Sequence, residues 1–166
     1  MAETAQQYKD RVLGLADRPV MKMLAETPRR IAKLVDGASP ARLKRRPAPG
    51  KWSVGEILAH LADDELVIGY RLRMIAGQPG AALQGFDQDA WAKQMNYAAR
   101  RPKASLSDYL ALRAINVDLL KELKPGQWKN VGIHSERGPE SISVIAQLAA
   151  GHDVLHMRQI EAILAK

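Results

Sequence analysis

Cysteine is absent from this chain of 166 residues, and aromatic side chains are scarce: three Trp, four Tyr and one Phe. Without cysteine there is no disulfide, no thiolate ligand and no cysteine nucleophile, so any metal site must use His, Asp, Glu or water. The apolar content is mostly Ala, Leu, Ile, Val and Met. Strands would need more β-branched and aromatic residues, so this composition favours helices.

A long hydrophobic run is also missing, and no stretch approaches the length of a membrane span. The first residues lack the charged and then apolar layout of a signal peptide. We therefore expect a cytoplasmic protein that does not enter a membrane. The length and the apolar fraction of 46% are ordinary for one globular domain, which we expect to span residues 1–166.

The formal net charge is +7, and basic residues cluster at 42–46 and 100–103. A nucleic-acid surface would add stacking aromatic residues or a groove-reading helix to such clusters. Here both clusters adjoin proline in apparent connectors, and no recognition motif accompanies them. They are interpreted as solvated linkers, and nucleic acid is not an expected partner.

Helical periodicity marks four segments, at about 18–35, 53–77, 106–123 and 141 to the end, with connectors rich in Pro and Gly between them. This pattern predicts an all-α four-helix bundle with long connectors. Pro28 lies inside the first segment and predicts a kink or a new start capped by Thr27. A short helix is expected near 87–95 and a hairpin within 128–139. The connectors can cross the bundle, so the sequence leaves the up-down order open.

The start of the second helix carries the clearest local signal. Ser53 and Glu56 have the spacing of a capping box, and Trp52 and Ile57 have that of a hydrophobic staple. The third helix is expected to begin at a cap on Ser105 or Ser107.

The last helix contains an anomaly. Its inward seam consists of four apolar residues, two histidines and an amide: Ile142, Ile145, Ala149, His152, His156, Gln159 and Ile163. Polar groups that face a core need partners. His152 and His156 project from one face, with Cβ atoms about 5–6 Å apart, so they can share one ion. The alternative is a hydrogen-bonded core pair, and the spacing alone does not decide between them.

His60 lies at the margin of the buried stripe of the second helix, where it can face the other two histidines. Asp64, one turn further, and Gln159 are candidates to support the ligands from behind. Three neutral histidines and an open position are typical of catalytic metal sites, and binding is expected to weaken below about pH 6. His134 lies in a polar connector and is expected to be a surface-loop residue.

Two longer motifs carry a resemblance to a known family. Residues 49–65, PGKWSVGEILAHLADDE, and residues 138–160, GPESISVIAQLAAGHDVLHMRQI, resemble the second-helix and last-helix motifs of the DinB-like (DinB/YfiT) superfamily. The segment FDQDAW at 86–91 is also similar, and the likeness covers most of the chain from residue 27 onward.

That resemblance implies a four-helix bundle, often with up-down-down-up topology and often a homodimer. It implies one divalent metal ion, such as zinc, nickel or iron, bound through His60, His152 and His156. Some members are implied to be thiol-dependent S-transferases or isomerases that use a low-molecular-weight thiol. The substrate pocket and the catalytic residues do not transfer.

Three functions remain open at this stage. The first is a metal-dependent S-transferase that activates a low-molecular-weight thiol for a small-molecule substrate, since the chain has no thiol of its own. Arg71 and Arg73 can hold its anionic groups, or they are solvent-facing helix charges. The second is a metal-dependent hydrolase with Asp64 as the base. The third is a non-catalytic metal-binding stress or interaction module, for which a closed site would be expected.

Overall fold

The computed structural model describes residues 3–165, and four long helices form its body. They are α2 (Val20–Val35), α4 (Val54–Gly77), α6 (Pro102–Glu122) and α7 (Ile142–Leu164). The four make a closed bundle in which α4 packs on α6, α6 on α2, α2 on α7, and α7 on α4. The all-α four-helix prediction is confirmed. Within the described residues, no helix is long and apolar enough to cross a membrane.

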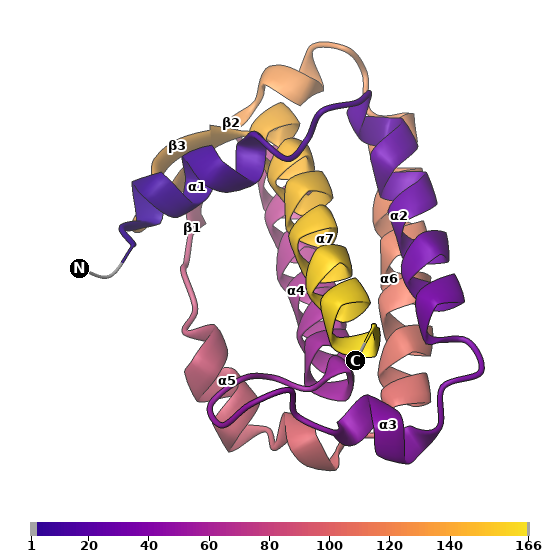
Figure 1. Ribbon diagram of the computed structural model, residues 1–166. Helices are drawn as coiled ribbons and strands as arrows, with labels where there is room; N and C mark the ends of the chain where they lie inside the picture. Colours follow the sequence, from indigo (N-terminus) through magenta and orange to yellow (C-terminus); the bar gives the residue numbers. More distant parts are fainter. Residues whose placement is uncertain (1–2, 166) are drawn as a thin grey trace.

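The helix directions follow from the connectors. Figure 1 shows α2 and α7 running one way along the bundle and α4 and α6 running the other way, which is the up-down-down-up order. The chain crosses the length of the bundle between α4 and α6, whereas α2 ends and α4 begins at the same end of the bundle. This crossing explains the length of the connector between α4 and α6.

Shorter elements occupy the connectors. They are α1 (Ala5–Leu13), α3 (Pro40–Lys44), α5 (Gln88–Gln94) and the 3₁₀ turns η1 (Tyr97–Ala99) and η2 (Gln127–Lys129). The predicted short helix is α5, which begins at Asp87, whose carboxylate accepts hydrogen bonds from two backbone N–H groups. The basic cluster at 42–46 includes α3, so it is partly helical and not simply a linker.

A small sheet closes one end of the bundle beside α1 (Figure 1). Its strands are β1 (Ala82–Leu83), β2 (Val131–His134) and β3 (Gly138–Ser141). The predicted hairpin is β2–β3, in which Gly138 has a φ of 72°, a left-handed conformation that glycine adopts without a steric penalty. β1 pairs in parallel with β2 and was not predicted, because two residues carry no periodic pattern.

Two predicted helix starts are wrong. Of the kink or new start expected at Pro28, the new start at Thr27 is absent: α2 is one helix from Val20 to Val35, and its buried face continues on both sides of the proline. α6 begins at Pro102, earlier than the predicted serine caps, and Ser105 is buried inside the helix. Proline suits the first helical position because its missing N–H would have no partner there.

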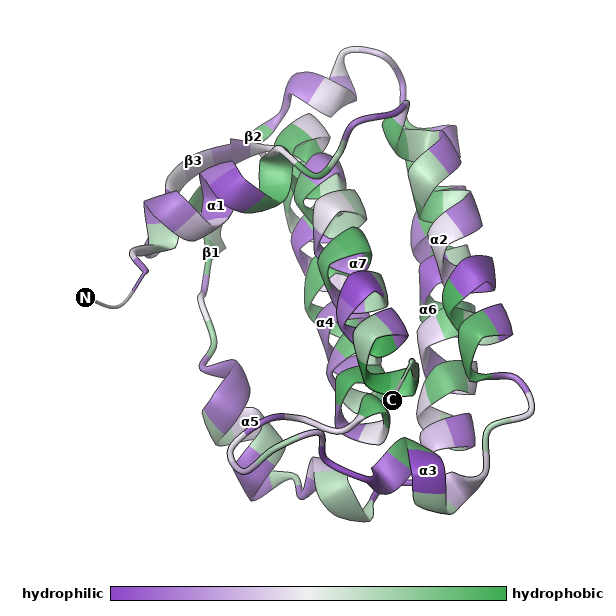
Figure 2. Ribbon diagram, in the orientation of Figure 1, coloured by the Kyte–Doolittle hydropathy of each residue, from purple (hydrophilic) through white to green (hydrophobic). Residues whose placement is uncertain are grey.

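The apolar core has two parts with a polar belt between them. One part gathers around Ile68 and Leu72 of α4 and Ala149 of α7, and the other around Leu61 of α4 and Ile160 of α7. Figure 2 shows hydrophobic residues along much of α4 and α7. His156 of α7 lies between the two clusters in the sequence, whereas His60 of α4 lies within the cluster around Leu61, and both side chains are buried. The site is therefore part of the bundle interior.

Candidate metal centre

His60 is positioned by a well-defined start of α4. The Ser53 side chain accepts from the backbone N–H of Glu56, and the Glu56 side chain accepts from the backbone N–H of Ser53, so the predicted capping box is present. Two turns later His60 points into the bundle and is 1% exposed. The Trp52 ring lies against it, with ring centroids 5.0 Å apart.

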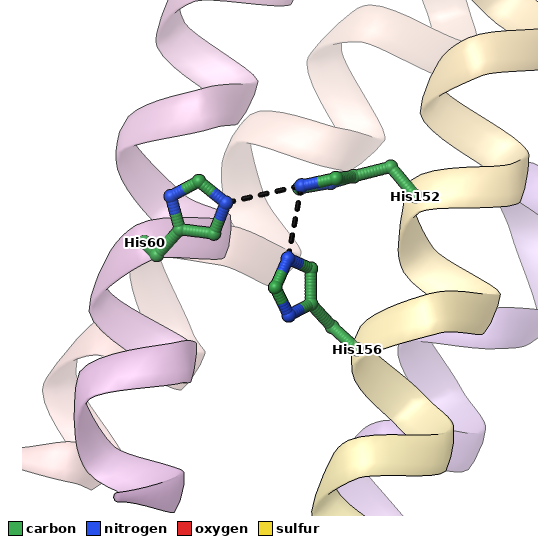
Figure 3. A group of neighbouring side chains, drawn as sticks. All are labelled: His60, His152 and His156. Carbon is green, nitrogen blue, oxygen red and sulfur yellow. Dashed lines mark hydrogen bonds between the residues drawn. The ribbon is translucent and has the colours of Figure 1, made fainter. Parts of the chain in front are cut away.

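His152 and His156 occupy successive turns of α7, which begins after Ser141. Both are buried. Their side chains face α4, and Figure 3 shows the three rings converging from the two helices. The Nε2 atom of His152 lies 3.0 Å from Nε2 of His60 and 3.0 Å from Nε2 of His156. One ring nitrogen from each histidine lies within 4.8 Å of the others.

The polar contacts on the far side of two rings determine where their protons are. His156 Nδ1 lies 2.8 Å from the Gln159 amide oxygen, which can only accept. His152 Nδ1 lies 3.3 Å from a carboxylate oxygen of Asp64. The Gln159 oxygen therefore places the proton of His156 on Nδ1, and the ionised Asp64 carboxylate favours the same tautomer of His152. In these tautomers both Nε2 atoms present lone pairs to each other. Two lone pairs at 3.0 Å make no hydrogen bond. A cation between them resolves this arrangement, so the donor set fits a metal ion.

Burial keeps all three imidazoles neutral. The pKa of His60 is well below 6.5 because burial disfavours the charged ring, and the nearby His152 adds to the effect. The pKa of His152 is lowered well below 6.5 by burial and then by His156. Burial and then His60 lower the pKa of His156 to about 3. Neutral imidazole is the form that binds metals.

Asp64 and Gln159 lie where the sequence interpretation placed them, each behind one histidine. The Asp64 side chain is 14% exposed and borders a cavity. Burial, followed by the negative charge of Glu65, raises the pKa of Asp64 to about 7. This carboxyl group can therefore exchange a proton near neutral pH.

The cavity beside the triad has a volume of about 450 Å³. Its walls come from α1, α4, α7, the segment 85–89 and the hairpin tip. Its polar groups include those of His60, His152, Asp64, Tyr8 and Arg71, and further charged side chains line it as well: Glu3, Asp87, Asp89, Glu136 and Arg137. Apolar residues of α1, α4 and α7 and the Phe86 ring complete the lining. Burial raises the pKa of Tyr8 to about 12, so its hydroxyl remains a hydrogen-bond donor. A space of this size accommodates a small organic substrate.

The structure separates the two arginines that the sequence grouped together. Arg71 is buried and borders the cavity, whereas Arg73 is exposed on another face of α4. Nη1 of Arg73 donates to the Gly69 carbonyl at 2.8 Å and to the Asn116 amide oxygen at 3.0 Å. Of these two arginines, only Arg71 can therefore contact a ligand in this cavity.

The expectation for His134 is wrong. It ends β2 and is 2% exposed, because the β-strand directs its side chain inward beneath the hairpin. Its Nδ1 accepts from the backbone N–H of Glu136 at 3.1 Å. Burial, followed by the charge of Arg137, lowers its pKa to about 4. In the sequence, the polar residues around His134 hide the alternation of inward-facing and outward-facing side chains along β2.

Sequence reasoning missed the contribution of α1 to the site. Tyr8 and Val12 of this helix border the cavity. A signal was present, because Thr4 and Gln7 form a capping box like that of α4. Only Val12 of α1 is buried, so the apolar periodicity that reveals longer helices is absent here.

Comparison with known proteins agrees with the fold. A protein of Oceanobacillus iheyensis named "Putative metal-dependent hydrolase OB0782" is 23% identical over 157 residues, covering 95% of this chain and 91% of that protein. The Bacillus subtilis protein named "Putative metal-dependent hydrolase YfiT" is 23% identical over 116 residues, covering 70% and 65%.

Two solved structures share the fold. The structure of Bacillus subtilis YfiT, described as a probable metal-dependent hydrolase with an unusual four-helix bundle topology, superposes with a TM-score of 0.80 at 21% identity, covering 98% of this chain and 88% of that one. A mycothiol-dependent maleylpyruvate isomerase gives a TM-score of 0.63 at 10% identity, covering 90% and 60%. Residues 23–160 match the sequence profile of the DinB superfamily, and the chain therefore belongs to that superfamily.

Proposed function

We propose that this protein binds one divalent metal ion through Nε2 of His60, His152 and His156 and is a metal-dependent hydrolase of a small molecule. The observation that carries the proposal is the pair of proton-free Nε2 atoms on His152 and His156, which face each other beside an open cavity. An open cavity argues against a purely structural metal centre, in which protein ligands fill every position. Similarity to proteins named as metal-dependent hydrolases supports the reaction class.

The residues around the centre have separate roles in this proposal. A bound divalent ion would lower the pKa of a water molecule and polarise a carbonyl oxygen. Oδ2 of Asp64 lies 3.3 Å from Nδ1 of His152, and its negative charge favours a ring orientation with the Nδ1 proton on that side. With a pKa of about 7, the Asp64 carboxylate also takes up a proton from the attacking water and returns it to the leaving group. Gln159 orients His156 through its amide oxygen, which accepts from Nδ1.

Elemental analysis of the purified protein, followed by assays on amide and ester substrates, tests this proposal. The informative variant is Asp64→Asn, because an amide oxygen can still face His152 Nδ1 but cannot take up a proton. We expect it to retain the metal and to lose hydrolysis by about 10²-fold or more. Asp118→Asn is the matched control, since Asp118 is exposed on α6 and pairs only with Lys121. Hydrolysis unchanged in Asp64→Asn would remove Asp64 from the reaction.

A thiol S-transferase is the second candidate, and the cavity favours it as well. A volume of about 450 Å³ can admit a cosubstrate beside the metal, and the chain has no cysteine to supply a thiol itself. The structural likeness to a mycothiol-dependent isomerase supports this candidate. Thioether formation from an added thiol and an electrophile, with no ester or amide hydrolysis, would favour the S-transferase. Stoichiometric metal without either activity would favour the non-catalytic module.

A further inference from the structure

Arg71 and Arg113 are the two buried arginines of the described chain, and they differ in their partners. Arg113 forms ion pairs with Asp153 and Glu65. Arg71 is only 7% exposed, yet it forms no ion pair with any carboxylate of residues 3–165. Burial lowers its pKa from the ordinary value of 12.5, but the group remains cationic at neutral pH. A buried cation without a counterion is costly, and a ligand can supply the missing charge.

The hydrogen bonds of Arg71 leave donors available. Within residues 3–165 they all use Nη2, which donates to the Gln84 carbonyl and lies 3.3 Å from Nε2 of His134. His134 is a poor acceptor, because its Nδ1 already accepts from two backbone N–H groups and its neutral ring therefore carries the proton on Nε2. Nε of Arg71 is buried and has no hydrogen-bond partner among the described residues.

We infer that Arg71 binds a carboxylate at the far end of the substrate from the metal centre, so that the substrate of the proposed hydrolase is an anionic amide or ester. This inference rests on the proposed function for the reaction, but the cavity and Arg71 alone determine the charge of the ligand. Tyr8 is a second, neutral donor on the α1 side of the same cavity.

Helix α4 determines the distance between the two ends of the proposed substrate site, the metal end beside Asp64 and the end at Arg71. Asp64 and Arg71 are seven residues apart on α4, which corresponds to two turns and about 10 Å of axial rise. Side chains of a helix tilt in the same direction, so their ends keep roughly this separation. A substrate that spans the cavity therefore carries its carboxylate several bonds from the reacting carbonyl.

No acidic group of residues 3–165 forms an ion pair with Arg71, although the charges of Asp64, Glu140 and Glu136 act on it. Asp64 lies beside His152, and Glu140 pairs with Arg137 and Lys9. Glu3 pairs with Arg11, and the Asp87 carboxylate caps α5. Glu136 and Asp89 are exposed at the rim, where water and salt screen their charge. Asp64 is at the metal end of the cavity, two turns of α4 from Arg71, so an anion that has entered is attracted to the Arg71 end.

Binding of linear dicarboxylates from succinate to sebacate to zinc-loaded protein, measured by calorimetry, tests the inference without requiring turnover. One carboxylate reaches the metal side and the other reaches Arg71, so affinity is expected to rise with chain length to an optimum. Arg71→Met should weaken binding of the optimal diacid by about 10- to 100-fold, the effect of losing a charge-assisted hydrogen bond, and Arg71→Lys should weaken it less. Arg73→Gln is the matched control and should change affinity less than twofold.

Monocarboxylates serve as the internal control, because they bind the metal side alone and Arg71→Met should leave their affinity unchanged. A merely structural role of Arg71 would weaken both ligand series equally. Affinity that does not depend on chain length, or that survives in Arg71→Met, would overturn the inference. If diacids bind as expected while no ester or amide is hydrolysed, the anion site stands and the proposed reaction fails.

Discussion

Arg113 of α6 holds Asp153 of α7 at two points, through Nη1 to Oδ2 at 2.5 Å and through Nη2 to Oδ1 at 3.1 Å. Nη2 also donates to Glu65 of α4 at 2.6 Å. Burial alone lowers the pKa of Arg113, but the charges of Asp153 and Glu65 outweigh burial and hold the pKa well above its ordinary value. Asp153 directly follows His152, so this network ties three helices together behind the candidate metal centre.

Replacing Arg113 is expected to destabilise the fold strongly. Arg113→Met leaves two buried carboxylates without a counterion, which costs about 3–5 kcal/mol of the free energy of unfolding. Urea denaturation followed by circular dichroism measures this loss. Lys121→Met is the control, because the Lys121–Asp118 pair is exposed and contributes less than about 1 kcal/mol. Equal midpoints for the two variants would show that the buried network does not stabilise the protein.

His156→Ala is expected to lose the metal and keep its helices, because apolar clusters on both sides of the triad hold the bundle. Gln159→Leu keeps the ligand but removes the acceptor that orients it, so metal affinity should fall by about 10- to 100-fold. Competition with a fluorescent zinc chelator gives both affinities. Stoichiometric zinc in His156→Ala would place the ligands elsewhere.

The pH dependence of metal binding should differ from that of free imidazoles. In the folded protein the pKa values of the three histidines are lowered, to about 3 for His156, so protons do not compete near pH 6 as the sequence alone predicts. We expect the folded protein to retain zinc after dialysis at pH 5. In urea, we expect the zinc to be released near pH 6. Loss of half of the zinc from the folded protein near pH 6 would contradict this expectation.

The same shifts predict how acid affects the metal-free protein. Between pH 6.5 and the lower folded-state pKa values, the unfolded chain binds more protons than the folded one, so stability falls as pH decreases. Burial of His134, whose pKa is about 4, acts in the same direction. The raised pKa of Asp64 acts in the opposite direction for one group, but four histidines outweigh it. The urea midpoint of metal-free protein should therefore still drop below pH 6.5. A midpoint that stays constant from pH 7 to 5 would show that the four histidines titrate normally when folded.

Local signals predicted much of this fold and less of the site. The cap of α4 at Ser53 and the cap of α7 at Ser141 were readable, since capping depends on neighbours within one turn. Whether His60 faces His152 depends on how α4 packs against α7, and only the family resemblance indicated this packing. Arg71 and Arg73 look alike in the sequence, and only their positions on α4 make one a cavity residue. Pairings such as Arg113 with Asp153 join residues far apart and leave no local pattern.

Gly151 controls how closely α1 approaches α7. A Cβ atom at this position would lie 2.0 Å from the Val12 carbonyl oxygen, which is backbone and cannot move without the helix. Gly151→Ala should therefore displace α1 and cost about 1–3 kcal/mol of the free energy of unfolding. Because Tyr8 and Val12 border the cavity, the displacement should also widen the substrate space beside His152.

Amide hydrogen exchange tests this coupling directly. In Gly151→Ala the amides of residues 5–13 should lose protection, while those at the centre of α4 keep theirs, since the four-helix bundle does not depend on α1. Gly77→Ala is the matched control, because a Cβ there has no atom within 4 Å and α4 ends at that residue. Unchanged protection of residues 5–13 in Gly151→Ala would mean that α1 does not need this close contact, and the cavity wall would then be independent of α7.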